Sequence, residues 1–287
     1  MQIDLHTHSN VSDGTMPPAE VMVQAARAGL DVIALTDHDT TGGWDEASRA
    51  AAELGLGLVP GIEISCTRDG RSIHVLGYLS DPRDEPLTRE LAKARESRLT
   101  RMDRMVENLI ADDVPITLEQ VYAQRADGAT LGRPHLADAL VAAGVVADRR
   151  EAFDRYLYNN SPYYAAHYAP DPVRAVELVQ AAGGVAVIAH PFSGHTNRAV
   201  SPELIEDMAA AGMLGIEVDH RDHDPAARAE LRALAARLGL IVTGASDYHG
   251  AGKPNVLGEN VTEEEAFEAI IAAGTGTPYA PPGAPAS

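Results

Sequence analysis

The amino-acid sequence predicts an α/β protein in which parallel strands and helices alternate and close into a (β/α) barrel. Two patterns lead to this fold. Short apolar runs alternate with amphipathic stretches that end at a glycine, as strands do when helices connect them. Histidine or carboxylate residues follow most of the apolar runs, so the strand ends are expected to share one face. An open doubly wound sheet is the alternative, but it would not gather six strand ends around one point.

The individual elements follow from these patterns in chain order. Strands are expected at residues 2–6, 31–36, 56–64, 72–79, 184–189, 215–218 and 240–244. Helices are expected between them at residues 17–28, 44–54, 170–182, 201–211 and 225–238. Each of these helices is followed by a glycine, the residue that most readily takes the left-handed conformation that ends a helix.

One long stretch, residues 81–166, breaks the alternation because it contains only helical patterns, at 85–111, 118–124, 135–143 and 150–158. We therefore expect a helical insertion of small-domain size that covers the substrate site. Residues 1–80 and 167–277 would form the barrel. The last residues, 278–287, are rich in Pro, Gly and Ala and are expected to be loose.

Metal-binding side chains open the chain and recur after the apolar runs. His6 and His8 are two residues apart at a strand end, so their imidazoles project to the same side and form half of a metal site. The other candidate ligands are Asp13, His38, Glu63, His74, His190, Asp247 and His249. An isolated pair of histidines is weak evidence, but nine candidates exceed what one ion needs, which predicts a multinuclear metalloenzyme.

Several neighbouring residues carry alternative interpretations. Asp13 could instead cap the helix that begins near Pro17. Asp37 and Asp39 are expected to orient His38 or to cap its turn through hydrogen bonds to ring or backbone nitrogens. The remaining histidines fall outside the ligand pattern. We expect surface or loop positions for His167 and His195, and substrate contact, proton donation or a polar loop for His220 and His223.

Composition narrows the setting and the partners. A net charge of −19 argues against an extended footprint on duplex nucleic acid, but it leaves small phosphorylated substrates open because bound metal ions reverse the local charge. Cys66, the only cysteine, cannot form an internal disulfide and is expected to be a small buried residue near Glu63. No signal-peptide pattern or membrane-length apolar run is present, so we expect a cytoplasmic protein without membrane contact.

The combined motifs resemble the PHP (polymerase and histidinol phosphatase) family over nearly the whole chain. The matching segments are Asp4-Leu-His6-Thr-His8-Ser-Asn-Val-Ser-Asp13-Gly, Thr36-Asp37-His38-Asp39, Gly61-Ile-Glu63, His74, Ala189-His190-Pro191 and Gly244-Ala-Ser-Asp247-Tyr-His249-Gly. The resemblance implies a distorted seven-stranded (β/α) barrel that holds two or three metal ions and cleaves phosphate esters. Many relatives carry histidine where this chain has Asp13.

The resemblance also implies a ligand assignment for three divalent ions. The first set is His6, His8, Glu63 and Asp247, the second is Asp13, His38 and His249, and the third is Glu63, His74 and His190, with Glu63 bridging. Mixed imidazole and carboxylate ligands suit Mn²⁺, Fe²⁺ or Zn²⁺, and the carboxylates favour Mn²⁺. A metal-bridging water would supply the attacking hydroxide. His223 is a candidate proton donor.

The insertion narrows the expected substrate. Its segments are similar to a PHP branch of nucleotide phosphatases: Arg98-Leu-Thr-Arg101-Met-Asp-Arg104-Met105, Gly132-Arg133-Pro134-His135-Leu-Ala and Phe153-Asp-Arg-Tyr156-Leu. This implies hydrolysis of the 3′-phosphate of 3′,5′-bisphosphonucleotides, such as 3′-phosphoadenosine 5′-phosphate, to the 5′-monophosphate. The alternatives are an exonuclease on short RNA or DNA, a histidinol-phosphatase-like phosphomonoesterase, and a degenerate PHP module that only binds a partner.

The expected substrate contacts are cationic side chains of the insertion, namely Arg98, Arg101, Arg104, Arg133 and His135. The first three recur every third residue, which drifts around a helix of 3.6 residues per turn, so they cannot all point at one phosphate together with Arg95. A solvated helix face is the alternative for any one of them.

Overall fold

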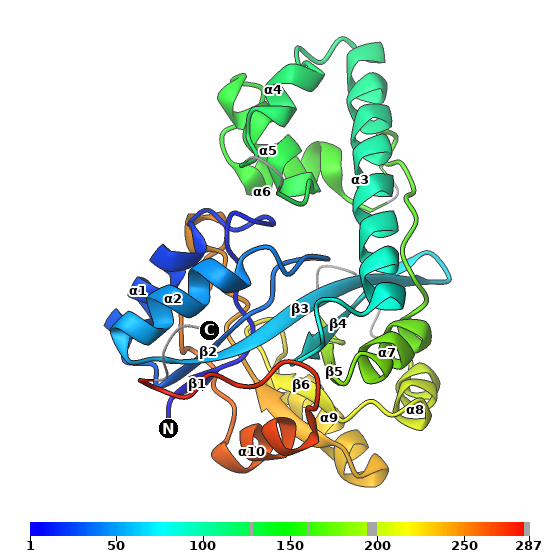
Figure 1. Cartoon of the computed structure of the whole chain (residues 1–287). Helices are drawn as coiled ribbons and strands as arrows, with labels where there is room; N and C mark the ends of the chain where they lie inside the picture. Colours follow the sequence, from blue (N-terminus) through cyan, green and yellow to red (C-terminus); the bar gives the residue numbers. More distant parts are fainter. Residues whose placement is uncertain (127–128, 160, 194–199, 284–287) are drawn as a thin grey trace.

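The computed structural model describes residues 1–126, 129–159, 161–193 and 200–283. Its strands form one seven-stranded sheet in chain order, drawn from blue to yellow and orange in Figure 1. They are β1 (Ile3–Asp4), β2 (Val32–Leu35), β3 (Gly57–Arg68), β4 (Arg71–Tyr78), β5 (Val185–Ala189), β6 (Gly215–Asp219) and β7 (Ile241–Gly244). A parallel bridge between Thr7 and Tyr248, just beyond β1 and β7, brings the two edges together. The predicted seven-stranded barrel, nearly closed, is confirmed.

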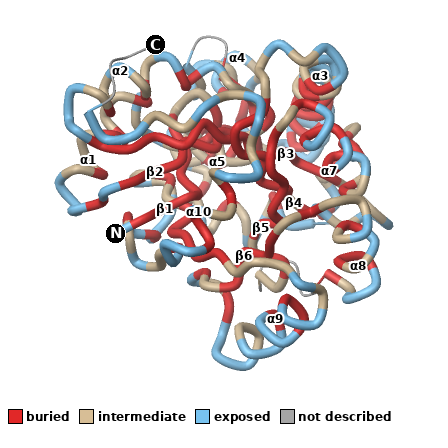
Figure 2. The backbone as a smooth tube through the Cα atoms, turned by 60° about the horizontal axis from the view of Figure 1, so that its bottom comes forward, coloured by how far each residue is buried: buried red, intermediate tan, exposed pale blue. Residues whose placement is uncertain are grey.

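Helices surround the barrel and bury the outer face of its strands. They are α1 (Pro18–Arg27), α2 (Trp44–Leu54), α7 (Pro172–Ala181), α8 (Pro202–Ala210), α9 (Pro225–Leu238) and α10 (Glu264–Ala273). Side-chain caps from Asp171, Ser201 and Asp224 begin α7, α8 and α9. Figure 2 shows buried strands inside a ring of helices whose outer surfaces are exposed. Burial on both faces explains why the strands read as continuous apolar runs.

The prediction of an all-parallel sheet is wrong at β4, which runs antiparallel to both β3 and β5. The turn between β3 and β4 is Asp69-Gly70, and both residues have positive φ, 53° and 71°. A two-residue turn of this kind makes a hairpin and leaves no room for a crossover helix. As a result, His74 lies within β4, opposite Ser65 of β3 and Ala189 of β5.

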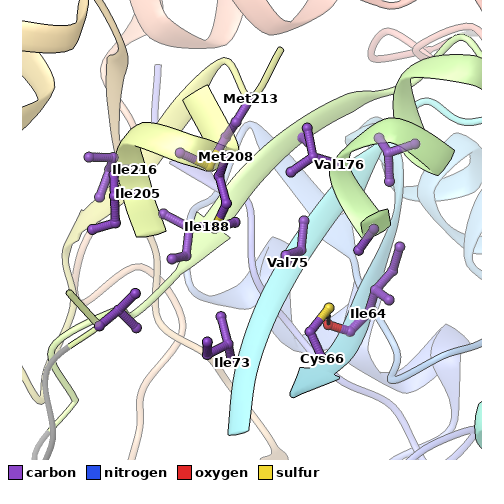
Figure 3. Packing of buried hydrophobic residues seen from close by; sticks show 14 of the residues in the cluster. Ile64, Cys66, Ile73, Val75, Val176, Ile188, Ile205, Met208, Met213 and Ile216 are labelled. Atoms are coloured by element: carbon purple, nitrogen blue, oxygen red, sulfur yellow. Dashed lines mark hydrogen bonds between the residues drawn. The ribbon is translucent and has the colours of Figure 1, made fainter. Parts of the chain in front are cut away.

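One hydrophobic core of the barrel lies between the strands and the outer helices. Figure 3 shows Val75 and Ile188 of the strands near Val176 of α7 and Met208 of α8. Cys66 belongs to the same cluster, as expected, and its thiol donates a weak hydrogen bond of 3.5 Å to the carbonyl of Ile64. Burial, followed by nearby carboxylates, raises the pKa of this thiol well above its usual value, so it stays protonated.

The insertion consists of helices, described by α3 (Glu85–Ala111), α4 (Leu118–Tyr122), α5 (Arg133–Ala142), α6 (Arg149–Ala152) and a π-helical turn η1 (Phe153–Leu157). These helices bury a core of their own that includes Met105, Leu109, Leu136 and Leu140. Figure 1 shows α3 leaving the barrel, with α4–α6 beside its far end. The Thr130 amide donates to the carbonyl of Val11, 2.8 Å away, which ties the insertion to the loop after β1.

The C-terminal segment is partly anchored, in contrast to the expected loose tail. Ala280 and Leu58 exchange two backbone hydrogen bonds of 2.9 and 3.1 Å, so the chain adds a short antiparallel bridge to the start of β3. Residues 284–287 lie outside the described part of the chain. Among the described residues, no helix combines the length and the apolar character needed to cross a membrane.

Candidate metal centre

Glu63 lies at the centre of a buried cluster of imidazoles at one end of the barrel. Its Oε2 atom is 3.1–3.2 Å from one ring nitrogen each of His6, His8 and His38. Its Oε1 atom is 2.7 Å from His74 Nδ1 and 3.2 Å from His190 Nε2. Because β3 places this carboxylate between β1 and β2 on one side and β4 and β5 on the other, one residue can serve two groups of ligands.

The nine residues expected to bind metal contribute to overlapping groups of donor atoms. Within a group, all donor atoms lie within 4.8 Å of one another. The groups are His8, Asp13, His38 and His249; His6, His8, Glu63 and Asp247; His38, Glu63 and His74; and His6, His190 and Glu217. The second group coincides with the set that the family resemblance implies for the first ion.

The hydrogen bonding of these donor atoms is consistent with a site for divalent cations. Four of them are buried and, among the described residues, make no hydrogen bond of suitable geometry even though oppositely charged groups lie 2.7–3.5 Å away: His38 Nδ1, His74 Nδ1, Asp247 Oδ1 and His249 Nε2. Buried polar atoms are nearly always paired, so such a concentration needs an explanation. Imidazole nitrogens and carboxylate oxygens that converge in this way are the usual ligands of Zn²⁺, Mn²⁺ and Fe²⁺.

Backbone geometry directs two of the ligands into the cluster. His190 follows β5 directly, Asp247 lies three residues after the end of β7, and both have positive φ, 26° and 52°. Residues other than glycine rarely adopt this conformation, and the strain it carries is concentrated at functional sites. The sharp turn after each strand fixes the direction of the side chain.

Asp13 points into the cluster and does not cap a helix. Its Oδ1 atom is 3.2 Å from His249 Nε2, and its Oδ2 atom is 3.8 Å from His38 Nε2. Helix α1 begins after Pro17 without any side-chain cap. The geometry therefore favours the ligand interpretation of Asp13 over the capping interpretation.

Glu217, which the sequence analysis did not single out, contacts two of the candidate ligands on the side away from the cluster. Glu217 of β6 is fully buried, and its Oε1 atom is 3.0 Å from His6 Nδ1. Its Oε2 atom accepts a hydrogen bond of 2.8 Å from the His190 amide. A carboxylate on the far nitrogen fixes the ring orientation and raises the basicity of a metal-binding histidine. The signal in the sequence was a glutamate inside an apolar strand.

The two aspartates beside His38 have structural partners. Asp37 accepts hydrogen bonds from the Ser9 amide, 2.8 Å, and the Ser12 hydroxyl, 2.6 Å. Asp39 accepts from the Ser65 amide, 2.8 Å. The expected bonds to backbone nitrogens are therefore present, whereas neither carboxylate bonds to the His38 ring in the described contacts.

The electrostatics divide the cluster into protonated and neutral groups when no cation is bound. Burial would raise the pKa of Glu63, but the surrounding imidazoles lower it well below its usual value, so the carboxylate is ionised. Burial would lower the pKa of His8, yet hydrogen bonds with Asp247 and Glu63 raise it to about 9. Burial, then Lys253 and His8, lowers the pKa of His249 to about 4. Metal binding must therefore displace protons from part of the cluster.

His220 and His223, for which the sequence analysis gave the same candidate roles, have different surroundings in the structure. His223 Nδ1 donates to the Val218 carbonyl, 2.8 Å, and its Nε2 accepts from the Phe192 amide, 3.1 Å. Both ring nitrogens are thus held by backbone, and His223 has no proton to donate to a substrate. His220 lines the metal cleft, and its buried Nε2 is 3.6 Å from Asp247 Oδ2 without a hydrogen-bond partner in the described residues.

The expected substrate-binding arginines separate into a buried group and an exposed residue. Arg98 binds Asp39 at 2.9–3.0 Å and also donates to the Ser65 hydroxyl. Arg101 is buried and donates through Nε to the Ala165 carbonyl, 3.0 Å. Arg104 is exposed and bonds to backbone carbonyls at 3.3 Å, one of them of its own helix. The expectation for Arg104 as a substrate contact therefore finds no support in its placement.

Arg133, which is half-buried, joins Arg98 and Arg101 in a group that we call the arginine cluster (Arg98, Arg101 and Arg133). Its guanidinium donates to the Leu157 carbonyl, 2.8 Å, and to Asn159 Oδ1, 2.9 Å. Burial, then the positive charges of Arg133 and Arg98, lowers the pKa of Arg101 to about 9. Such an accumulation of positive charge is typical of an anion-binding site.

Two histidines of the insertion region have different surroundings from those expected. His135 is buried, and its Nδ1 accepts a 3.1 Å hydrogen bond from the Gly132 amide at the start of α5, so it serves first as a helix cap. His167 is half-buried, and burial together with Arg101 and Arg98 lowers its pKa to about 3. His167 is therefore a neighbour of the arginine cluster rather than a plain surface residue. His195 lies outside the described residues.

Lys253, which the sequence analysis did not single out, completes the rim. It follows the short 3₁₀ turn η3 (Gly250–Gly252) that begins directly after His249. Its Nζ donates a 2.6 Å hydrogen bond to Asp247 Oδ2, although its side chain is 40% exposed. An ammonium group that touches a metal ligand and also reaches solvent is placed to contact a phosphorylated substrate.

Known proteins resemble this chain in both sequence and structure. The family model of the PHP domain matches residues 4–130. A 3′,5′-nucleoside bisphosphate phosphatase from Chromobacterium violaceum is 37% identical over 88% of this chain and 88% of its own length. A 5′-3′ exoribonuclease from Haemophilus influenzae is 36% identical over 86% of this chain and 89% of its own.

A solved structure agrees with these relatives. A protein from Bifidobacterium adolescentis described as a metal-dependent phosphoesterase superposes with a TM-score of 0.91 at 42% identity, covering 95% of this chain and 96% of that one. The similarity therefore includes the insertion as well as the barrel. The degenerate-module alternative loses its basis because every expected ligand is present in the cluster. This chain belongs to the PHP family of metal-dependent phosphoesterases.

Proposed function

We propose that this protein hydrolyses the 3′-phosphate of 3′,5′-bisphosphonucleotides, releasing the 5′-monophosphate and orthophosphate. The observation that carries the proposal is the arginine cluster beside the metal cleft. Arg98 donates to Ser65, the residue that pairs with His74 across the β3–β4 hairpin. One anionic group can therefore bind at the ligands while a second binds the guanidinium groups. The 37% identical bisphosphate phosphatase supports the same substrate class.

Three divalent ions, with Mn²⁺ favoured, are the proposed cofactors. The ligands would be the three sets named above, with Glu63 shared between the first set and the third. Bound ions would activate water and neutralise charge on the reacting phosphate. Asp13 supplies a hard oxygen ligand in the group with His38 and His249, which favours Mn²⁺ over softer ions.

The protein's own side chains supply positioning and proton transfer. The arginine cluster would hold the 5′-phosphate and thereby align the 3′-phosphate, since remote binding energy can raise turnover by fixing the reacting group. His220 Nε2, which faces Asp247, would donate a proton to the leaving 3′-oxygen. Glu217 would keep the His6 ring in the orientation in which Nε2 faces Glu63.

A second candidate is 5′-3′ exonuclease activity on short RNA. The exoribonuclease relative is nearly as similar as the phosphatase, 36% against 37% identity. The same two anion sites would serve it, because a 5′-phosphorylated RNA also presents two phosphates one nucleotide apart. The two candidates therefore differ in whether the reacting 3′-phosphate is terminal, as in a bisphosphonucleotide, or is esterified to a second nucleoside, as in RNA.

A substrate panel with Mn²⁺-loaded protein tests the proposal. The panel contains a 3′,5′-bisphosphonucleotide, the corresponding 3′- and 5′-monophosphates, histidinol phosphate and a short 5′-phosphorylated RNA. We expect the bisphosphate to exceed the 3′-monophosphate in kcat/KM by at least about tenfold, the value of one charge-assisted contact. The 5′-monophosphate should not be cleaved. Equal rates on both monophosphates would refute the assignment.

A further inference from the structure

A segment between η1 and α7, residues 165–170, connects the arginine cluster with the barrel. At one end the Ala165 carbonyl accepts a 3.0 Å hydrogen bond from Arg101. At the other end the Pro170 carbonyl accepts one of 2.9 Å from the Thr67 amide, near the end of β3. The segment therefore spans the same two regions as the proposed substrate, which reaches from the metal centre to the arginine cluster.

His167 lies in the middle of this segment and is held by backbone contacts on both sides. The carbonyl of Ala166 accepts a 3.3 Å hydrogen bond from Arg104. The amide of Tyr168 donates a 2.6 Å hydrogen bond to Ser97 Oγ. Both partners belong to α3, so this helix fixes the position of His167 relative to the arginines that it carries.

The pattern of burial along the segment indicates that the His167 ring faces inward. Ala165 and Ala169, two residues away on either side, are buried. The adjacent Tyr168 lies on the other side, where its ring centroid is 3.4 Å from Nζ of the exposed Lys93. Because alternate residues of an extended chain share a side, the imidazole of His167 lies on the buried side with the two alanines.

The electrostatic surroundings of His167 agree with this orientation. Its pKa is lowered to about 3, first by burial, then by the positive charges of the arginine cluster, and then by that of His74. The ring is therefore neutral at physiological pH. Neither ring nitrogen makes a hydrogen bond with the described residues. A neutral imidazole has one donor and one acceptor nitrogen, and both are available to a ligand.

A neutral donor–acceptor ring beside three guanidinium groups suits an uncharged hydroxyl of the ligand. The ribose joins the two phosphates of a 3′,5′-bisphosphonucleotide, so it would lie between the metal centre and the arginine cluster. Its ring oxygen can only accept a hydrogen bond, whereas its 2′-hydroxyl can both donate and accept. The 2′-hydroxyl is also next to the carbon that bears the reacting phosphate, on the side of the metal ligands.

We infer that His167 hydrogen-bonds the ribose 2′-hydroxyl of the substrate and makes the protein select ribonucleotides over 2′-deoxyribonucleotides. The inference rests on the proposed function, because it places the 3′-phosphate at the metal centre and the 5′-phosphate at the arginine cluster. It goes beyond that function, since neither phosphate distinguishes the two sugars. His167 is thus a specificity-determining residue, and no bond is made or broken at its ring.

Two substrates that differ only in the sugar provide the test. With Mn²⁺-loaded protein, kcat/KM is measured for 3′-phosphoadenosine 5′-phosphate and for its 2′-deoxy analogue. We expect the wild type to prefer the ribonucleotide by about tenfold, the value of one hydrogen bond. His167→Ala should reduce this preference to within about twofold, by lowering the value for the ribonucleotide and leaving that for the deoxyribonucleotide nearly unchanged.

Two further variants separate recognition of the sugar from a structural role. Tyr168→Phe is the matched control, because it removes a hydroxyl of the same segment that donates to Glu90, and it should keep the wild-type preference. His167→Gln retains a donor and an acceptor and should recover part of the preference. If His167 only supported the fold, His167→Ala would lower kcat/KM for both substrates to the same degree.

Binding of the reaction products gives a readout that does not depend on turnover. Adenosine 5′-monophosphate carries the 5′-phosphate and the 2′-hydroxyl, and its 2′-deoxy analogue lacks only the hydroxyl. Calorimetry with Mn²⁺-loaded wild type should show about tenfold tighter binding of the ribonucleotide. His167→Ala should bind the two monophosphates with affinities within about twofold of each other.

The outcomes separate this inference from the proposed function. A wild type that hydrolyses both bisphosphates with equal kcat/KM would overturn the role of His167 and leave the proposed function intact. A preference that persists in His167→Ala would also overturn it, because another residue would then recognise the hydroxyl. If neither bisphosphate is hydrolysed, the proposed function fails, and the affinities of the two monophosphates alone decide whether His167 recognises the sugar.

Discussion

The barrel and the insertion both contribute charged residues to the site, but they hold them in different ways. Barrel ligands lie within β3 and β4 or in the loops that follow strands, on short side chains, and several have no partner other than the cluster itself. Insertion arginines lie on helices, on long side chains, and each donates to backbone or to a carboxylate. The difference indicates that the barrel side chains keep their donor atoms available for a bound cation. The arginines instead use some of their N–H groups to stabilise the insertion and keep the others available for an anion.

The largest effect is expected from Glu63→Gln, which removes the shared carboxylate charge. Five imidazole nitrogens face its two oxygens, so the first and third proposed metal sites lose the charge of a ligand and His38 of the second loses its carboxylate neighbour. Removing a residue that merely supports a ligand costs about 10–100-fold, so this change should lower kcat by more than about 100-fold. Metal content after gel filtration should fall as well. Near-normal turnover with full metal content would mean that Glu63 is not a ligand.

Removing a single arginine should show which cations hold the structure. Arg98→Ala leaves Asp39 buried without its ion-pair partner, and breaking a buried pair in this way costs about 3–5 kcal/mol of unfolding free energy. Arg104→Ala is the matched control on the same helix and should change that free energy by no more than about 0.5 kcal/mol. Urea unfolding measures both. Similar losses of unfolding free energy in the two variants would mean that Arg98 contributes no more to stability than the exposed Arg104.

Glu217→Gln tests whether the Glu217 carboxylate helps His6 to bind metal. The amide keeps the shape but weakens the bond to His6 Nδ1, so the affinity for Mn²⁺ should fall about 10–100-fold. Isothermal titration calorimetry of the metal-free protein with Mn²⁺ measures this affinity. Glu230→Gln, on the exposed face of α9, is the control and should bind Mn²⁺ like the wild type. A normal affinity in Glu217→Gln would place that carboxylate outside the metal centre.

The smallest effect, and the most selective, is expected from Arg133→Gln. Loss of one charge-assisted contact to the 5′-phosphate should lower kcat/KM for a bisphosphate about tenfold and leave the corresponding 3′-monophosphate nearly unaffected. Arg155→Gln, an exposed residue of the same insertion, is the control. If both substrates lost activity to the same degree, Arg133 would be a structural residue and the insertion would not recognise the 5′-phosphate.

Residues that depend on local sequence were the predictable part of this molecule. His6, His8 and Asp247 lie beside strands whose direction the apolar pattern already indicates, so the barrel and the candidate ligands followed from it. The reversal of β4 was also encoded locally, because Asp69-Gly70 between two apolar runs favours a hairpin. The parallel arrangement was predicted for this strand because the other strands alternate with helices, and the local hairpin signal was given less weight.

Residues that depend on distant partners were not predictable. Arg98 binds Asp39, 59 positions away, and this pairing decides that its guanidinium is largely occupied. Glu217 reads as part of an apolar strand until His6, 211 positions away, is seen against it. The roles of His220 and His223 depend on which ring meets the backbone of Phe192. None of these contacts has a signature in neighbouring residues.

The reversal of β4 has a mechanical consequence for the whole enzyme. A strand that runs backwards leaves the chain away from the metal face, so the polypeptide must travel back before an insertion can cover that face. Helix α3 makes this return: its 27 residues span about 40 Å at 1.5 Å per residue. Its first turns pack through Leu87 and Leu91 into the barrel core, and its last turns carry the core of the insertion. One continuous helix thus sets the height of the insertion above the candidate metal centre.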